Sequence, residues 1–499
     1  MTIFFEGNDF KYEMENVARL FFPLRRFSFG YAPEEEPAED CLVFIRKETE
    51  GGWTLTVKVR TDSFSEDVVS FVPFGEKGEN DCEMEFARML YRLLQKATGV
   101  TPRWGVLTGI RPVKRLQFAM DSGVSREEAM AEMREEGLVS EEKIRLTMQI
   151  ADVQKELLSD LQPNDFSLYV SIPYCPSRCS YCSFVSHSID QPKAKKLLPE
   201  YLSHLVQEIA FTAKLARETG LRLRSVYIGG GTPTALTAEQ LKLVTDAVRE
   251  HFDPPKELEY TIEAGRADTI TPEKLQVIRD AGANRISINP QSFEDSVLAA
   301  VGRKHTALQV EECYRLAQGY GFEAINMDLI AGLPTDTPEG FRYSLDRAIA
   351  LAPENITVHT LSVKRAADLF AERDGSEDYS DVQAMVDYTG RAMEAAGYIP
   401  YYLYRQKNIV GNLENVGYAK PGFYGKYNVY IMEEVQTILA VGAGAVSKVV
   451  RPGRIDRVFN YKYPYEYLSR FSDILTRKES LRELLKGGDG LGDRPEGTA

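Results

Sequence analysis

The sequence has 499 residues, of which 43% are hydrophobic and 27% are charged, and its formal net charge is −14 at pH 7. This length allows two or three domains with full cores, and the composition is that of an ordinary globular protein. The negative charge disfavours a broad electrostatic grip on nucleic acid, and no apolar run reaches membrane-spanning length. Because the opening residues also lack the basic segment of a signal peptide, we expect a cytoplasmic protein.

Residues 1–163 are predicted to form a separate α+β domain with no assigned role. The apolar runs Cys41–Ile45 and Trp53–Val59 flank a Gly-Gly pair and predict a β-hairpin. Glu83–Lys96 carries apolar residues at helical spacing. The connection Trp104–Lys114 contains a tryptophan, two glycines and two cations, so it could be an anion or partner site or, more simply, a packed turn.

Residues 164–365 alternate strand and helix six times. The predicted strands are 167–173, 225–228, 258–263, 285–289, 324–329 and 356–361. Thr237 with Gln240, and Thr306 with Gln309, form capping boxes at helix starts. Repeated strand–helix units indicate a parallel sheet, doubly wound or curled into a barrel, with ligands at the carboxyl ends of its strands.

The remaining residues are predicted to form two further segments. Residues 366–485 make a C-terminal α/β extension with a helix near 382–396 and a strand near 399–403. Residues 486–499 are glycine-rich without apolar periodicity, and we expect a disordered tail.

Three cysteines follow the first of the six strands: Cys175, Cys179 and Cys182. Thiolates are soft ligands, so this loop predicts zinc or an iron–sulfur cluster, and the scattered remaining cysteines favour a reducing compartment. A closed zinc site needs a fourth ligand, for which His187 is the nearest candidate. A four-iron cluster held by three cysteines instead leaves one iron open to a substrate.

Polar residues recur where the later strands end. A glycine-rich turn, Gly229–Thr234, follows the second strand, and Glu263 closes the third. Gln291, Arg303 and Asp328 lie at or beyond the next strands. Taken alone, the turn is a tight connection and Glu263 could pair with Arg285, but a shared ligand better accounts for several polar groups at one edge of a sheet.

The cysteine spacing, with Tyr181 before the third cysteine, resembles the radical S-adenosylmethionine (SAM) superfamily. With the polar residues at the strand ends, the chain looks most like the oxygen-independent coproporphyrinogen III oxidase (dehydrogenase) family, in its HemZ-type branch. The resemblance implies an α/β fold. Its core would be a partial (β/α)6 barrel, with an N-terminal α+β domain and a C-terminal extension covering the barrel.

The resemblance also implies site residues. Cys175, Cys179 and Cys182 would hold a [4Fe-4S] cluster, and Tyr169, Tyr181, Gly230 and Glu263 would hold the SAM bound to it. A second SAM, as in the best-known members, would contact Gly231, Thr232, Gln291, Arg303 and Asp328, and Gly229 lies in the same turn. Gly442–Val446 resembles a late glycine-rich SAM contact, which adds Val446.

The family reaction converts two propionate side chains of a tetrapyrrole into vinyl groups, with a separate electron donor and acceptor. The substrate carries four carboxylates, so cations are expected around it. The candidates are Lys364, Arg365, Arg405 and Lys407, each of which could instead be a solvated surface charge.

Two positions depart from the family's dehydrogenases. Ser171 stands where they have a histidine, and Phe184 stands where they have a fourth cysteine. The related haem-chaperone branch also lacks that cysteine, so haem binding and delivery is the alternative, although its His-Asn-x-x-Tyr-Trp motif is absent here. The resemblance favours the enzyme, and net charge disfavours tRNA modification.

Overall fold

The computed structural model describes residues 1–23, 25–31, 40–75, 78–109, 111–184, 186–362, 379–406 and 409–486. It divides the chain into two compact units. The first contains 1–151 with the described parts of 373–383 and 404–414, and the second contains the rest. Lys364, Arg365, Lys407 and the predicted disordered tail from 487 onward lie outside the described residues.

The first unit is built on a five-stranded sheet in the order β2-β1-β3-β4-β5. Its strands are β1 (Thr2–Glu6), β2 (Ser28–Tyr31), β3 (Cys41–Thr49), β4 (Gly52–Thr61) and β5 (Phe64–Pro73). β3 and β4 pair antiparallel, which confirms the predicted hairpin, and β4 buries alternate residues such as Leu55 and Val57. These side chains pack with residues of α1 (Lys11–Phe21) and α2 (Glu79–Thr98) in one hydrophobic core.

Three further helices follow in the chain: α3 (Pro112–Asp121), α4 (Arg126–Glu135) and α5 (Glu141–Leu157). The connection before them is a packed turn. Trp104 is fully buried, and its indole nitrogen donates to Glu414 Oε2 over 2.7 Å. Gly105 has φ +55°, and a Cβ there would lie 2.0 Å from the carbonyl oxygen of Gly137. Packing therefore accounts for this glycine and this tryptophan without a ligand.

The second unit is built on an eleven-stranded sheet in the order β14-β15-β13-β12-β11-β10-β9-β6-β16-β17-β18. The six strands predicted for the core form its centre and run parallel. They are β6 (Asp165–Ile172), β9 (Arg222–Gly230), β10 (Glu259–Glu263), β11 (Arg285–Ser287), β12 (Ala324–Ala331) and β13 (Asn355–Thr360). Their carboxyl ends therefore share one edge of the sheet.

Later strands extend the sheet on both sides of this centre. On one side β16 (Thr437–Val441) pairs parallel with β6 and continues antiparallel into β17 (Val446–Arg451) and β18 (Arg454–Phe459). On the other side stand β15 (Asn415–Ala419) and β14 (Ile399–Tyr404). The parallel core is thus an open, partial barrel.

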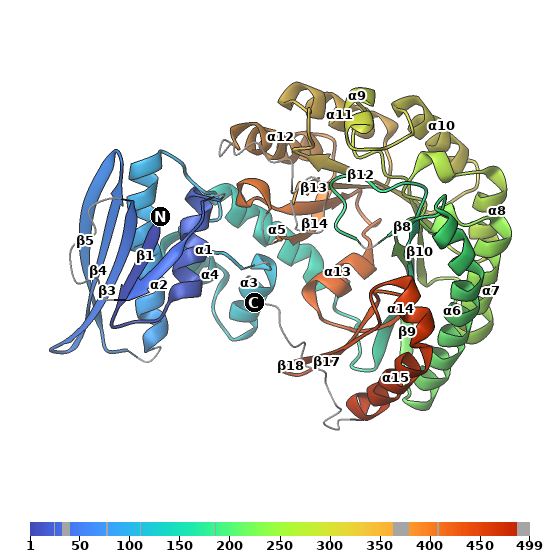
Figure 1. Ribbon diagram of the computed structural model, residues 1–499, viewed down its shortest axis with the longest axis horizontal. Coiled ribbons are helices and arrows are strands. Elements are labelled where there is room, and N and C mark those ends of the chain that lie inside the picture. Colours follow the sequence, from blue (N-terminus) through green and yellow to red (C-terminus); the bar gives the residue numbers. More distant parts are fainter. Residues whose placement is uncertain are drawn as a thin grey trace. The chain divides into compact units, whose positions relative to one another are not determined.

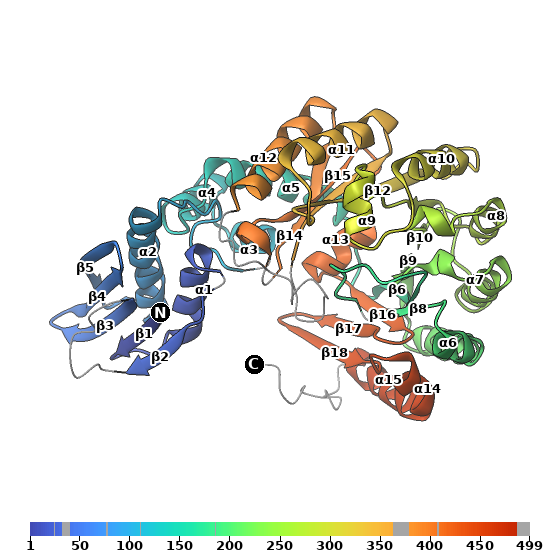
Figure 2. The same ribbon diagram turned by 45° about the horizontal axis from the view of Figure 1, so that its top comes forward.

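Helices α6, α7, α8 and α10 follow one another along the outer side of the curved sheet (Figures 1 and 2). The helices of this part of the chain are α6 (Pro192–Glu218), α7 (Ala238–Phe252), α8 (Pro272–Asp280), α9 (Asp295–Ala300), α10 (Ala307–Gln318), α11 (Pro338–Leu351), α12 (Ser380–Ala395), α13 (Lys426–Glu433), α14 (Pro464–Ser469) and α15 (Phe471–Leu485). Both predicted capping boxes are present, at the starts of α7 and α10. Across the described ranges, no helix combines the length and apolarity needed to cross a membrane.

Candidate functional site

The cysteine loop leaves the carboxyl end of β6, as predicted. Cys175 lies in the short strand β7 (Tyr174–Cys175), which pairs with β8 (His187–Ser188) and so closes the loop on itself. All three cysteines are free thiols. Burial, together with the charges of Cys179 and Cys175, raises the pKa of Cys182 to about 11. The three sulfurs are therefore near enough to influence one another, and a bound cation would favour their thiolate forms.

The glycine-rich turn lies against this loop. Thr232 donates its hydroxyl to the sulfur of Cys175 over 3.5 Å, and its backbone nitrogen donates to the carbonyl of Tyr174 over 2.7 Å. A Cβ on Gly231 would lie 2.5 Å from that same carbonyl oxygen. Only a residue without a side chain lets β9 end so close to the cysteines.

The zinc alternative with His187 finds no support in the described part of the chain. There, no three His, Cys, Asp or Glu side chains are placed to bind one metal ion. A single zinc ion needs its ligands in one coordination sphere, whereas each cysteine of a four-iron cluster binds a different iron. Three soft ligands on one loop fit the cluster.

Glu263 ends β10 beside the glycine-rich turn. Its carboxylate accepts a hydrogen bond from the hydroxyl of Tyr227 over 2.5 Å, and burial raises its pKa to about 7. The predicted alternative, an ion pair with Arg285, is not formed. Arg285 instead lies 4.0 Å from Glu259 and donates to Asn355. Among the described residues, Glu263 thus has no cationic partner. Its carboxylate is therefore available to a cationic ligand.

Gln291 has an unusual backbone for a residue with a side chain. Its φ is +69°, and its backbone is fixed to β12 by hydrogen bonds with the carbonyl of Asp328 and the nitrogen of Ile330, at 2.8 and 3.0 Å. Strained conformations of this kind persist where the surroundings impose them, and they cluster at functional sites. The Asp328 side chain accepts from the amide of Asn326 over 2.8 Å.

Arg303 is buried near the cysteine loop. It donates to the carbonyl oxygens of Asn289 and Gly265 over 2.7 and 3.3 Å. Burial works against its charge, but the neighbouring Tyr181 and Cys179 raise its pKa overall. Tyr181 and Arg303, predicted separately from the sequence, therefore lie side by side.

Buried polar atoms that have no hydrogen-bond partner among the described residues include Gln291 Oε1, Asn289 Oδ1 and Arg303 Nε. Buried polar groups are normally paired, so unpaired acceptors and donors indicate a polar ligand. SAM carries amino, carboxylate and hydroxyl groups that match this mixed set. The residues present therefore fit the cofactors that the resemblance implies.

Tyr169 belongs to a stack of aromatic rings inside the sheet. Its ring lies 6.2 Å from that of Tyr227, which in turn lies 4.5 Å from the ring of Tyr427 on α13. Tyr427 is a residue that sequence reasoning missed, because nothing local shows that a helix 258 positions after Tyr169 returns to it. Its backbone nitrogen donates to Glu259 over 2.8 Å, which fixes the start of α13.

The late glycine-rich segment Gly442–Val446 lies beside β6. Ser171 donates its hydroxyl to the carbonyl of Ala443 over 2.9 Å. The fully buried Glu208 of α6 accepts from the nitrogen of Gly442 over 2.8 Å. Ser171, which replaces the family's histidine, is therefore engaged in holding this segment.

Arg266 is a second residue that sequence reasoning missed. Its side chain is buried, and it forms two hydrogen bonds to the carboxylate of Asp268, at 3.0 and 2.8 Å. It also donates to the hydroxyl of Ser177 over 2.8 Å and lies 3.9 Å from the sulfur of Cys179. The sequence pattern that could have identified Arg266 is a cation three residues after Glu263, on the loop that leaves the same strand.

Arg405, a predicted substrate cation, is held by contacts within the first unit. It belongs to the first unit, where it is buried and donates to the carbonyl oxygens of Leu107, Gly109 and Asn412. Its guanidinium lies 5.3 Å from the ring of Trp104, and burial lowers its pKa to about 10. Its terminal nitrogens are engaged by backbone carbonyls, whereas its Nε has no hydrogen-bond partner among the described residues, so a role toward the substrate stays a prediction.

Comparisons with known proteins agree with this arrangement. Residues 169–348 match the model of the radical SAM superfamily. The chain is 39% identical over 478 residues to the oxygen-independent coproporphyrinogen-III oxidase-like protein HemZ of Bacillus subtilis, covering 93% of this chain and 94% of that protein. It is 32% identical over 308 residues to the heme chaperone HemW of Haemophilus influenzae, covering 60% and 75%.

Among solved structures, the chain resembles coproporphyrinogen III oxidase (HemN) from Escherichia coli. The two share 24% sequence identity and superpose with a TM-score of 0.51, over 65% of this chain and 72% of that one. The likeness shows that the two proteins share a fold.

Proposed function

The chain belongs to the radical SAM superfamily and, within it, to the oxygen-independent coproporphyrinogen-III oxidase-like proteins of the HemZ type, and on this premise we propose that it converts coproporphyrinogen III into protoporphyrinogen IX. Each of two propionate side chains would lose carbon dioxide, one hydrogen atom and one electron, and would thereby become a vinyl group. An external acceptor takes the electron.

Cys175, Cys179 and Cys182 would hold a [4Fe-4S] cluster, and Tyr181, Gly230 and Glu263 would hold SAM beside it. When bound, the cluster and SAM supply one-electron chemistry that abstracts a hydrogen atom from the substrate. Gly230 brings backbone groups to the ligand, and the Glu263 carboxylate offers an acceptor to a cationic or hydroxyl group. Gln291 and Arg303 would bind the remaining polar groups, including those of a second SAM.

The observation that carries this proposal is the contact between Thr232 and Cys175. It brings the glycine-rich turn, a loop suited to the amino-acid part of a ligand, to the first of the three sulfurs. These sulfurs would hold a cluster beside that turn.

Anaerobic reconstitution with iron and sulfide, followed by incubation with SAM, a reductant and coproporphyrinogen III, tests the proposal. The expected products are protoporphyrinogen IX and 5′-deoxyadenosine. Cys179→Ala should abolish both, whereas Cys313→Ala, on α10, should leave both unchanged. Failure of the intact, iron-loaded protein to form either product would overturn the enzyme proposal.

Haem binding and delivery is the second candidate. It is favoured by Phe184, which stands where the family's dehydrogenases have a fourth cysteine, and by Ser171, which is engaged with Ala443. Tight, stoichiometric binding of haem by protein that forms no protoporphyrinogen would select the carrier function over the enzyme.

A further inference from the structure

A cavity of about 350 Å³ lies directly beside the cysteine loop and shares no residue with the expected SAM contacts. Its lining comes from that loop and the segment after it, from the residue before α6, and from the turn between β18 and α14. The lining residues are Arg178, Ser183, Phe184, Ser186, His187, Ser188, Gln191, Lys462 and Tyr463. This volume lies at the lower end of the roughly 300–1,000 Å³ range of small-molecule sites.

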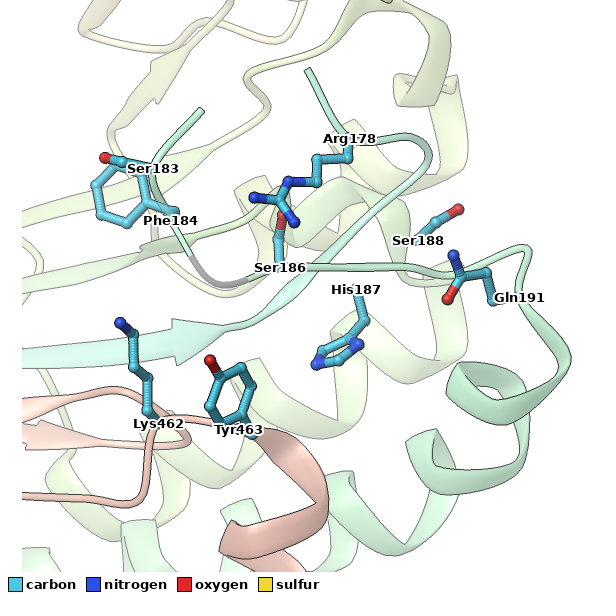
Figure 3. A pocket seen from close by; sticks show the side chains of 9 residues that line it. All are labelled: Arg178, Ser183, Phe184, Ser186, His187, Ser188, Gln191, Lys462 and Tyr463. Atoms are coloured by element: carbon cyan, nitrogen blue, oxygen red, sulfur yellow. The ribbon is translucent and has the colours of Figure 1, made fainter. Parts of the chain in front are cut away.

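The cavity carries positive charge. Arg178 and Lys462 line it, and none of its nine lining residues is acidic. Figure 3 shows the Arg178 side chain on one side of the cavity and the side chains of Lys462 and Tyr463 on the opposite side. Burial lowers the pKa of His187, and the charges of Lys193 and Arg178 lower it further. In a chain of net charge −14, this local excess of positive charge selects an anion.

Aromatic side chains stand beside these cations. Phe184 is 65% exposed and Tyr463 is 37% exposed. A large exposed phenyl ring and a guanidinium in the lining of one cavity suit a ligand that joins a carboxylate to a flat apolar ring. Arg178 directly precedes Cys179, so such a ligand would lie next to the loop that carries the expected cluster ligands.

We propose that this cavity binds one carboxylate side chain of the tetrapyrrole. Arg178 and Lys462 are its cationic partners, and Phe184 packs against the adjoining pyrrole. The inference rests on the proposed function, and it adds cations for carboxylate recognition next to the cysteine loop.

Binding of coproporphyrin III, a stable oxidised tetracarboxylate, to anaerobically reconstituted protein tests this site by fluorescence titration without turnover. Arg178→Gln and Lys462→Gln should each weaken binding about tenfold, since a charge-assisted hydrogen bond contributes about that much. Lys462→Arg, which keeps the positive charge, should retain most of the affinity for coproporphyrin III. The control Lys242→Gln removes an equal charge from an exposed lysine of α7 that pairs with Asp246, and should change nothing.

The tetramethyl ester of coproporphyrin III should bind the unaltered protein more weakly than the acid. Equal affinity of acid and ester, or a Lys462→Gln variant with unchanged affinity and unchanged iron content, would overturn the site. Arg178→Gln is interpreted only at unchanged iron content, because it adjoins Cys179. Unaltered protein that binds the acid more tightly than the ester but forms no protoporphyrinogen would refute the proposed reaction and leave the site standing.

Discussion

At the residue scale, the cysteine loop depends on a buried cation. Arg266 donates to Ser177 and lies 3.9 Å from the sulfur of Cys179, while Asp268 fixes its orientation. The potentials of protein-bound clusters depend on net charge and on hydrogen bonds to their sulfurs. Arg266 is therefore placed to make a cluster on this loop easier to reduce.

Arg266→Gln should shift the reduction potential of the reconstituted cluster to a more negative value, because it removes a positive charge beside Cys179. Arg266→Lys should shift it less. The measurement is a redox titration followed by electron paramagnetic resonance. Arg222→Gln, which removes a cation from the buried Asp165 at the other end of β6, serves as the control. Equal potentials in Arg266→Gln and the unaltered protein would contradict this role.

Glu263 gives a pH dependence that can be measured without turnover. Burial raises its pKa from 4.5 to about 7, so the folded protein binds this proton more tightly than the unfolded chain. In the absence of SAM, stability should therefore fall as pH rises from about 4.5 to about 7 and then level off. Thermal unfolding should show a smaller fall in Glu263→Gln, and identical pH profiles would speak against a half-buried carboxyl group without a cationic partner.

Part of this site follows from sequence and part does not. The cysteines, the glycine-rich turn and Glu263 lie within or directly after predicted strands, so their shared edge follows from the alternation of strand and helix. The positive φ of Gln291 does not follow, because it is imposed by hydrogen bonds to β12, nearly 40 residues later. The backbone contacts of Arg405 do not follow either, because a partner 298 residues away leaves no local signal.

At the element scale, the segment Gly442–Val446 is held against β6 by a buried network around Glu208. This carboxylate accepts from the nitrogen of Gly442, the hydroxyl of Tyr467 and the amide of Asn460. It also lies 3.1 Å from the ammonium of Lys478, and both side chains are buried. The network joins α6, the segment after β16 and the two C-terminal helices.

Glu208→Ala should destabilise the second unit by about 3–5 kcal/mol, because it leaves the ammonium of Lys478 buried and unpaired. Glu208→Gln keeps most of the hydrogen bonds and should cost less. Denaturant unfolding followed by circular dichroism measures both variants. The control Glu466→Ala alters a partly exposed carboxyl on α14. A Glu208→Ala transition that coincides with that of the unaltered protein would contradict the network's importance.

Local sequence patterns predicted where helices and strands begin, but they did not predict which elements pair with one another. Thr237 and Thr306 start helices as their capping boxes indicate, because capping depends on residues three positions apart. The pairing of β16 with β6 joins strands about 270 residues apart, and no local pattern encodes it. The stacking of Tyr427 with Tyr227 and Tyr169 could not be predicted either, because these residues are also far apart in the sequence.

At the scale of the whole molecule, the first unit is completed by a late part of the chain. Glu414 accepts from the indole of Trp104 and lies 2.6 Å from the ammonium of Lys143, with both side chains of the ion pair at most 2% exposed. A fragment of 1–151 would contain Trp104 and Lys143 without Glu414. It would therefore lose the buried carboxylate that faces Lys143 and keep only that of Glu142, 3.2 Å away and 44% exposed.

The fragment 1–151 should consequently leave Trp104 more accessible to water than the intact chain does. Tryptophan emission in a Trp53→Phe background, which isolates Trp104, should shift to longer wavelength in the fragment. Glu414→Gln in the full chain should keep the indole buried but lower stability. A fragment with the same emission maximum as the intact chain would show that 1–151 folds without Glu414.

The central claim is that three cysteines hold a four-iron cluster with one iron free to bind SAM. Electron paramagnetic resonance of the anaerobically reconstituted, reduced protein, recorded before and after addition of SAM, tests it most directly. We expect a [4Fe-4S] signal whose g values change when SAM is added. The change in g values should be smaller in Glu263→Gln. A chain that binds zinc and no iron, or a cluster signal that SAM leaves unchanged, would contradict it.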